Sequence, residues 1–416
     1  MIAKTSTPWP DKISDDAFHG LAGEFVELVK PHSEADPVAL LIQFLVGSGA
    51  YLGRNAFTMA EASRHHPNLF AAIVGNSSKA RKGSSWSWVR QFLLQVDEQW
   101  TNSKVCSGLI SGEGLIYHVR DPIIKTTPSG EASIIDDGVD DKRLLSVEEE
   151  FSAVLKAAGR DKATLSDVMR KAWDGNQTLR TLAKNSPVTA TGSHVAVIGH
   201  ITTMELKSLL ANVDCVNGFG NRFLWCLVQR AQLLPHGGNF AIEDLRPIAN
   251  KLSDIRNAFD FVPCQIHRTK AADIAWETLY HELAEPKPGL LGPITARSEA
   301  QVLRLSLLYA LLDNCRAIDE EHLAAAKAVW DYCDQSAAII FGHSTGNQLA
   351  DKILGIVTEH GAGGISRTEL SAKLGRNKLK ADIDAAVDLL IECQRVENFT
   401  VPTDGRPEHR LRLIDA

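Results

Sequence analysis

The chain has 416 residues, a net charge of −7, and hydrophobic and charged contents of 44% and 23%. These values are typical of a globular protein with two or three domains, and the negative charge argues against a protein that coats DNA with its whole surface. The seven cysteines form no CxxC pair, which indicates a reducing compartment rather than a disulfide or zinc framework. Without an apolar signal core or an uninterrupted membrane span, the chain is expected to be cytoplasmic, with no membrane partner.

Apolar patterns divide the chain into four segments. Residues 1–60 have the three- and four-residue spacing of helices. Residues 61–235 alternate strand-like with helical runs, which predicts an α/β core with a mainly parallel sheet. Residues 236–345 return to helical patterns. Residues 346–416 give three helical patterns followed by two strand patterns, which predicts a winged helix.

The stretch "IVGNSSKARKGSSWSWV", residues 73–89, combines a buried strand, a polar basic loop and the start of a helix. Backbone N–H groups in such a loop, together with the helix N-terminus, form a site for phosphate groups. The standard spelling GxxxxGK[ST] is absent, so the cation could be Lys79 or Lys82, and Lys82 is favoured because it precedes the helix start. The predicted nucleotide-binding residues are Gly75, Asn76, Ser77, Ser78, Lys79, Lys82, Gly83, Ser84 and Ser85. The alternative is an ordinary basic turn.

The stretch "KRLLSVEEEF", residues 142–151, predicts a short strand that ends in acids. Such a strand end can orient the water shell of Mg²⁺ and polarise an attacking water. Glu148 and Glu150 form the expected pair, with Glu149 pointing away, and Glu148 joins Ser84 as the predicted metal-binding residues. The alternative is an acidic helix start.

Two further residues follow glycine-containing turns near strands. His200 lies at the tip of the apolar strand in "SHVAVIGHITTMEL", where it could touch a γ-phosphate or the attacking water. Arg222 lies between the turn and the strand of "NGFGNRFLWCLVQR", and such an arginine can stabilise transition-state charge on a neighbouring subunit's nucleotide. The alternatives are a loop histidine and an ordinary salt bridge.

The stretches quoted above occur together with two more, "TLRTLAKNSPVTATG" and "TARSEAQVLRLSLLYALLD". Their order along the chain resembles that of AAA+ ATPases of the minichromosome-maintenance (MCM) helicase group. More closely, the chain is similar to bacterial, phage and plasmid helicase-like ATPases that accompany primase–polymerase modules. The resemblance runs from about His19 to Phe341. It implies a P-loop ATPase core at 61–235 and a helical lid at 236–345.

The resemblance also implies roles by position. Lys82 and Ser84 match the Walker A lysine and hydroxyl, and Glu148 and Glu150 match Walker B. His200 takes the place of sensor 1, Arg222 that of the arginine finger, and Arg297 that of sensor 2. Lys184 matches the lysine of a hairpin that pushes DNA. The chain departs from the family pattern in its Walker A spelling, in the asparagine that is usual where His200 stands, and in the glutamate that opens Walker B.

Glu113, in "VCSGLISGEGLIYHVRD", offers a different catalytic base. If the core were similar to RecA-type rather than AAA+ ATPases, a glutamate after this strand would activate the attacking water. The lid and hairpin favour the AAA+ interpretation, and a helix N-terminal acid is the plain alternative.

The last segment carries basic residues at the start of its third helix and on its wing. These positions meet phosphates in winged helices that bind DNA. The candidates are Arg376, Lys378, Lys380 and Arg406. Winged helices also serve as protein-docking units.

The sequence thus predicts a ring-forming motor that uses ATP and Mg²⁺, a replicative-type DNA helicase of a mobile element, plasmid or phage. The expected assembly is a homo-hexamer with single-stranded DNA in its channel and duplex DNA at the winged helix. The expected partner is a separately encoded primase or initiator. The alternative is an ATPase-deficient DNA-binding replication or regulatory factor that acts through its winged helix.

Overall fold

A computed structural model of the chain describes residues 9–126, 132–181, 188–210, 218–260, 262–342, 347–375, 378–392, 395–402 and 407–414. The chain divides into two compact units. The core unit comprises residues 1–285 and 294–337, and the C-terminal unit comprises residues 286–293 and 338–416. Among the helices of the described ranges, none combines the length and apolar character needed to cross a bilayer.

A five-stranded, entirely parallel sheet lies at the centre of the core unit. Its order is β11 (Phe223–Leu227), β3 (Phe70–Val74), β10 (His194–Ile201), β7 (Arg143–Glu148) and β4 (Val105–Cys106). The prediction of a mainly parallel α/β core is confirmed. Strand β10 separates β3, which leads into the basic loop, from the acid-tipped β7.

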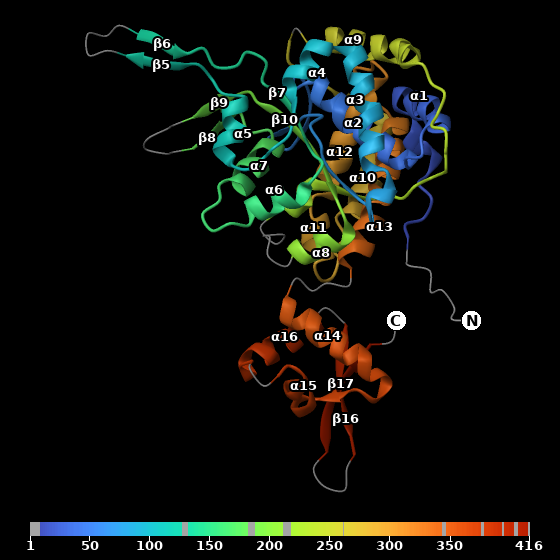
Figure 1. Ribbon diagram of the computed structural model, residues 1–416, viewed down its shortest axis with the longest axis vertical. Helices are drawn as coiled ribbons and strands as arrows, with labels where there is room; N and C mark the ends of the chain where they lie inside the picture. Colours follow the sequence, from blue (N-terminus) through green and yellow to red (C-terminus); the bar gives the residue numbers. More distant parts are fainter. Residues whose placement is uncertain are drawn as a thin grey trace. The chain divides into compact units, whose positions relative to one another are not determined.

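Helices cover both faces of this sheet, as Figure 1 shows. On one face lie α2 (Pro37–Leu52) and α3 (Lys82–Val96), and on the other lie α6 (Phe151–Ala158) and α7 (Leu165–Trp173). All eight residues of β10 are buried, as expected for a parallel strand with both faces covered. Asp36 caps the start of α2, because its side chain accepts the Val38 N–H at 3.0 Å, and all residues of the helix after Pro37 are buried.

The helices of residues 1–60 and 236–345 share one hydrophobic core with the sheet. Besides α2, α3, α6 and α7, the helices that precede the last segment are α1 (Gly20–Val29), α4 (Glu98–Lys104), α5 (Gly112–His118), α8 (Thr203–Leu210), α9 (Arg246–Phe259), α10 (Lys270–Leu283), α11 (Leu291–Thr295), α12 (Ser298–Leu312) and α13 (Glu320–Phe341). Short strands form two small sheets beside the main one. One consists of β1 (Ala56–Ala60), β2 (Ser63–His65) and β12 (Cys264–Gln265), and in the other β13 (His267–Arg268) pairs with β14 (Ala317–Ile318).

Two β-hairpins are inserted between strands of the main sheet. Strands β5 (Ile123–Thr126) and β6 (Ala132–Asp136) form an arm that extends away from the sheet (Figure 1), and the isoleucines of this arm are exposed. Strands β8 (Thr178–Arg180) and β9 (Thr189–Thr191) pair in antiparallel fashion just before β10. The hairpin that the sequence resemblance implied is therefore present, but Lys184 lies outside the described residues.

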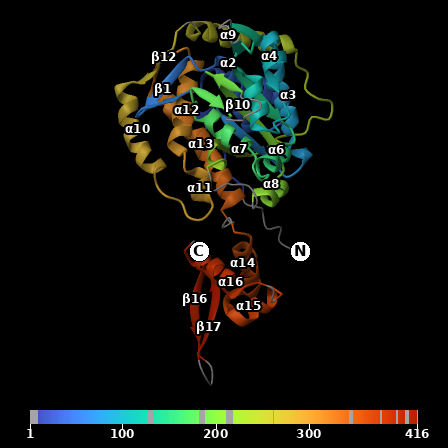
Figure 2. The ribbon, with the colours of Figure 1, turned by 90° about the vertical axis from the view of Figure 1, so that its left-hand side faces the viewer.

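The C-terminal unit contains three helices followed by a hairpin, as the sequence patterns predicted (Figure 2). The helices are α14 (Gln348–His360), α15 (Arg367–Lys373) and α16 (Lys380–Glu392). The antiparallel sheet has the order β15 (Ile365–Ser366), β17 (Glu408–Leu413) and β16 (Val396–Val401). The unit has its own hydrophobic core, and neither the two-residue β15 nor the 3-10 turn Gly361–Gly363 was predicted.

Candidate nucleotide-binding site

A cavity of about 690 Å³ opens where the loops after β3, β7 and β10 meet. It therefore lies at the carboxyl ends of the parallel strands, where open α/β sheets bind their ligands. Its lining residues are Ser78, Arg81, Lys82, Gly83, Ser84, Glu149, Glu150, His200, Ile201, Thr202, Met204 and Glu205. The cavity thus combines a basic loop, an acidic strand end and a histidine.

The loop between β3 and α3 curls tightly because Gly75 has no side chain. A Cβ atom at Gly75 would lie 2.5 Å from the Cβ of Ala80, closer than real contacts allow. A single 3-10 turn, Ser78–Ala80, then leads into α3 at Lys82. The first N–H groups of a helix have no intrahelical acceptor, and the residue before α3 supplies no side-chain cap. The start of α3 is therefore suited to phosphate groups.

Lys82 reaches back across this loop. Its Nζ donates hydrogen bonds to the carbonyl oxygens of Gly75 at 3.3 Å and Ser77 at 3.2 Å. Burial lowers the pKa of Lys82, an effect that the charges of Glu205 and Glu150 oppose. Lys79 is exposed and does not line the cavity. The geometry therefore favours Lys82, as the sequence interpretation did.

The two candidate hydroxyls differ in position. Ser84 lines the cavity, whereas Ser85 is fully buried, donates to the Lys82 carbonyl at 2.7 Å and accepts from Gln43 Nε2 at 2.6 Å. The prediction that Ser85 contacts the nucleotide is wrong in this structure, because its hydroxyl is already engaged. Gly83 occupies the place directly after the lysine, where the standard spelling has a hydroxyl.

The remaining predicted loop residues organise the turn. The side-chain oxygen of Ser77 accepts the Lys79 N–H at 3.1 Å. The Thr203 hydroxyl donates to Asn76 Oδ1 at 2.9 Å, which links the loop to the start of α8.

The acidic side of the cavity differs from the prediction. Glu149 and Glu150 are exposed and both line the cavity. Glu148 does not, because its carboxylate accepts hydrogen bonds from the N–H groups of Gly108 (2.9 Å) and Leu109 (3.1 Å) and from the Ser146 hydroxyl (2.6 Å). Glu148 is thus a structural acid between β7 and the chain after β4, and its assignment as a metal-binding residue is corrected.

The assumption that Glu149 points away was wrong because strand alternation does not continue past the end of β7. Residues 149 and 150 form a turn before α6. In this turn the period of two that orients side chains along a strand no longer applies.

His200 lines the cavity from the end of β10 and is buried. Its Nε2 lies 2.9 Å from Gln43 Oε1. The Gln43 amide nitrogen donates to Ser85 Oγ and to the Ala39 carbonyl at 3.1 Å, so Oε1 must accept and His200 Nε2 carries the proton. Burial, with a smaller effect of the Lys82 charge, lowers the pKa of His200 to about 4, so the ring is neutral at pH 7.

Gln43 was missed by the sequence analysis as a functional residue. It is the only residue of "VALLIQFLV" with a polar side chain, and it is fully buried in the structure. A single amide in an otherwise apolar buried helix is a signal of a hydrogen-bonded partner.

Arg222 directly precedes β11 and therefore lies at the amino end of the sheet, opposite the cavity. Its side chain is 6% exposed and forms a bidentate pair with Asp174, with Nη2–Oδ2 at 2.7 Å. Arg297 contacts the same carboxylate at 3.4 Å, and both guanidinium groups lie over the Trp173 ring. The expectation that Arg222 is presented on an accessible loop is wrong in this structure, and neither arginine reaches the cavity of its own chain.

Glu113 also lies outside the cavity lining. It stands in the first turn of α5 and accepts a hydrogen bond from the Thr164 hydroxyl at 2.9 Å. This placement fits a helix N-terminal acid rather than a catalytic base.

In the C-terminal unit, Lys378 and Lys380 are exposed at the start of α16. Their positions are compatible with phosphate contacts. Arg376 and Arg406 lie outside the described residues.

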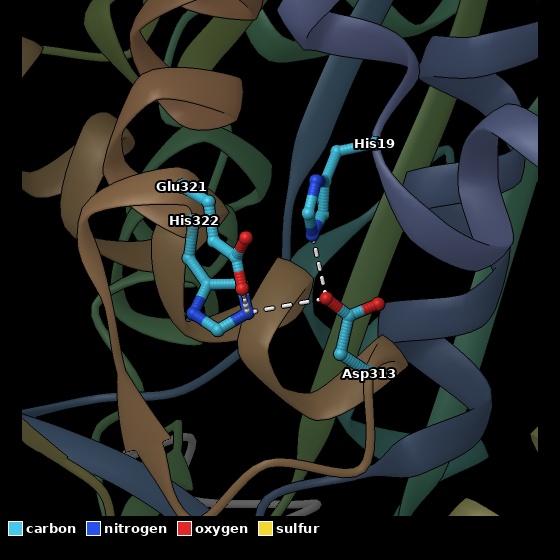
Figure 3. A group of neighbouring side chains, drawn as sticks. All are labelled: His19, Asp313, Glu321 and His322. Atoms are coloured by element: carbon cyan, nitrogen blue, oxygen red, sulfur yellow. Dashed lines mark hydrogen bonds and ion pairs between the residues drawn. The ribbon is translucent and has the colours of Figure 1, made fainter.

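A separate cluster joins the starts of α1 and α13 to the end of α12 (Figure 3). Asp313 Oδ2 lies 2.6 Å from His19 Nε2 and 3.2 Å from His322 Nε2, while Glu321 stands at the edge. These side chains offer the donor atoms that a metal ion could use.

The proton positions argue against a metal at this cluster. The Asp319 N–H donates to His322 Nδ1 at 2.9 Å, so His322 carries its proton on Nε2 and donates it to Asp313. His322 Nε2 therefore has no free lone pair for a metal. The hydrogen bonds of Asp313 to both histidines outweigh the effect of burial and lower its pKa. The cluster is best described as a hydrogen-bonded connection between these helices.

No model of a known protein family matches the chain, and no curated protein matches it either.

Proposed function

We propose that the chain binds ATP with Mg²⁺ in the cavity at the ends of β3, β7 and β10 and hydrolyses it. The observation that carries this proposal is the meeting of Lys82 and the open start of α3 with Glu149 and Glu150 in one cavity. A triphosphate requires both backbone N–H groups and a cation, whereas its metal and attacking water require carboxylates.

Five of the lining residues have a role in this proposal. The start of α3 and Lys82 would hold the phosphates, and Ser84 and Glu150 would hold Mg²⁺. When bound, Mg²⁺ neutralises charge on the phosphate oxygens. Glu149 or Glu150 polarises the attacking water. His200, held neutral by Gln43, is a hydrogen-bonding group close to the terminal phosphate rather than a charge.

We further propose that the ATPase is an AAA+ motor of the MCM-like group that forms a hexameric ring on DNA. Three features support this: the parallel core with its helical segment at 236–345, the β8/β9 hairpin immediately before β10, and the three helices and hairpin of the C-terminal unit. In this proposal the hairpin contacts single-stranded DNA in the channel, and the C-terminal unit is a winged helix. The motor acts in the cytoplasm with a separately encoded primase or initiator.

The test compares the wild-type chain with Lys82→Ala and Glu150→Gln variants. ATP binding and steady-state hydrolysis are measured with and without single-stranded DNA. We expect Lys82→Ala to lose nucleotide binding and Glu150→Gln to keep binding but lose turnover. A wild-type protein that binds no ATP would overturn the proposal. A strand-displacement assay then separates unwinding from other uses of ATP.

A second candidate is a DNA-binding replication or regulatory factor without ATPase activity. It is favoured by Gly83, which removes the usual hydroxyl after Lys82, and by Glu148, whose carboxylate is fully engaged. DNA retention by both the wild type and Lys82→Ala, without turnover by either, would establish this candidate.

A further inference from the structure

Arg81, the residue before Lys82, has an unusual backbone conformation. Its φ of 58° and ψ of 30° lie in the left-handed region, which glycine adopts freely and other residues adopt at an energetic cost. In the spelling GxxxxGK[ST], a glycine stands at this position. Four non-glycine residues of the described part of the chain have positive φ: Glu61, Arg81, Lys162 and Asn314. Of these, Arg81 alone lines the cavity.

A side chain retained at a strained position beside a binding cavity indicates a function for that side chain. The Arg81 guanidinium is held from one edge, because its Nε donates to Glu34 Oε2 at 2.6 Å. Its terminal nitrogens make no hydrogen bond to the described residues. The side chain is 38% exposed, so that its outer edge is accessible from the cavity.

Glu34 is in turn fixed in place. Its Oε1 accepts the Leu234 N–H at 2.9 Å, and Arg230 lies 3.9 Å from Oε2. The Glu34 side chain is only 17% exposed. A partly buried, anchored carboxylate therefore sets the direction of Arg81, as orienting partners do for groups that contact ligands.

We propose that Arg81 contacts the terminal phosphate of the nucleotide bound to its own chain and that Glu34 positions it. This inference rests on the proposed function, and it goes further by assigning the second cation of the site. Lys82 bridges the loop carbonyls of Gly75 and Ser77, whereas Arg81, held by Glu34, presents its terminal nitrogens to the cavity. Arg222 cannot serve the same cavity within one chain, because it is paired with Asp174 at the other end of the sheet.

The decisive variant is Arg81→Gly, which removes the cation and also relieves the backbone strain. We expect ATP turnover to fall roughly 10³-fold, the magnitude associated with an arginine on the transferred phosphate. Affinity for ADP, which lacks the terminal phosphate, changes less than about 3-fold if its contacts are with the loop and Lys82. The melting temperature stays equal to that of the wild type or rises.

Lys162→Gly provides the matched control. Lys162 has a φ of 61°, is exposed and lies outside the cavity. Glycine relieves the same kind of strain there without removing a group from the site. We expect unchanged turnover for Lys162→Gly. Equal turnover for Arg81→Gly and the wild type would overturn the inference and leave the proposed ATPase intact.

The role of Glu34 is tested by combining variants. We expect Glu34→Gln to lower kcat by about 10-fold in the wild-type background and to have no further effect when Arg81 is already glycine. A merely structural role for Glu34 would give the same effect in both backgrounds and would overturn its assignment as a positioning residue. If the wild type neither binds nor hydrolyses ATP, the proposed function itself fails, which is a distinct outcome.

Discussion

His200 Nε2 donates a hydrogen bond to Gln43 Oε1 at 2.9 Å and so connects the end of β10 to the middle of α2. The Gln43 amide continues this connection to Ser85 at 2.6 Å, and the Ser85 hydroxyl reaches the Lys82 carbonyl at 2.7 Å. One buried amide thus links the end of β10 to the first turn of α3 at the candidate site. All three side chains are buried, so each lost hydrogen bond leaves a desolvated polar group.

Replacement of Gln43 by leucine should therefore destabilise the fold by about 1–3 kcal/mol, because His200 and Ser85 lose their partner without access to water. Chemical denaturation measures this change in the free energy of unfolding. The control is Gln99→Leu in α4, where the glutamine is exposed and the expected change is within about 0.5 kcal/mol. Equally small changes in the free energy of unfolding at both positions would contradict the role of Gln43 in linking His200 to Ser85.

His200 also makes stability depend on pH. Its pKa is about 4 in the folded chain, below the value of 6.5 expected in the unfolded chain, because burial disfavours the charged ring. The unfolded state therefore binds more protons between these values, and the contribution of His200 to stability is lost as pH falls from about 6.5 to 4. The slope it adds is up to about 1.4 kcal/mol per pH unit.

A His200→Asn variant should show a shallower loss of stability over this pH window than the wild type. Urea denaturation at several pH values gives the slope directly. Other buried histidines, His194 among them, retain their own contribution, so the difference between the two proteins is the quantity to compare. Identical slopes would show that His200 does not titrate as its burial requires.

Gly83 and Gly75 form a matched pair for testing the loop. A Cβ atom at Gly83 meets nothing within 4 Å, whereas at Gly75 it would lie 2.5 Å from Ala80. Gly83→Ser restores a hydroxyl after Lys82, so we expect unchanged or slightly higher stability and tighter Mg²⁺-dependent ATP binding. Gly75→Ser should abolish nucleotide binding. Nucleotide titrations with and without Mg²⁺ measure both, and loss of binding in both variants would contradict the assigned register.

Arg222 should act mainly through stability. Arg222→Ala removes one partner of a largely buried ion pair with Asp174, and the expected destabilisation is about 3 kcal/mol. Lys171→Ala, which breaks an exposed pair with Asp167, should cost less than about 0.5 kcal/mol. Thermal unfolding compares the two. An Arg222→Ala protein of normal stability that has lost ATP turnover would instead restore the arginine-finger assignment.

Much of the fold was predictable because its signals are local. The apolar run of residues 195–198 indicated a strand of a mainly parallel sheet, and the structure places β10 inside such a sheet. The helical spacing and the strand patterns of the last segment likewise predicted the helices and the hairpin of the C-terminal unit.

The site was less predictable because its residues meet across long stretches of sequence. The pairing of Ser85 with Gln43, 42 positions earlier, and of Arg222 with Asp174, 48 positions earlier, leaves no periodic signal in the chain. The prediction for the acidic residues after β7 was wrong for another reason. Whether Glu148 or Glu149 faces the cavity depends on where β7 ends, and element boundaries are the weakest part of a sequence interpretation.

The burial of α2 has a consequence for the synthesis of the protein on the ribosome. This apolar helix is complete by residue 52, yet it is covered by β10, which ends at Ile201. At the usual pace of translation, roughly 7–30 s pass between the two. During that interval the apolar residues of α2 that contact β10 lack this partner in the nascent chain, and earlier neighbours such as α1 and α3 can cover only part of the helix.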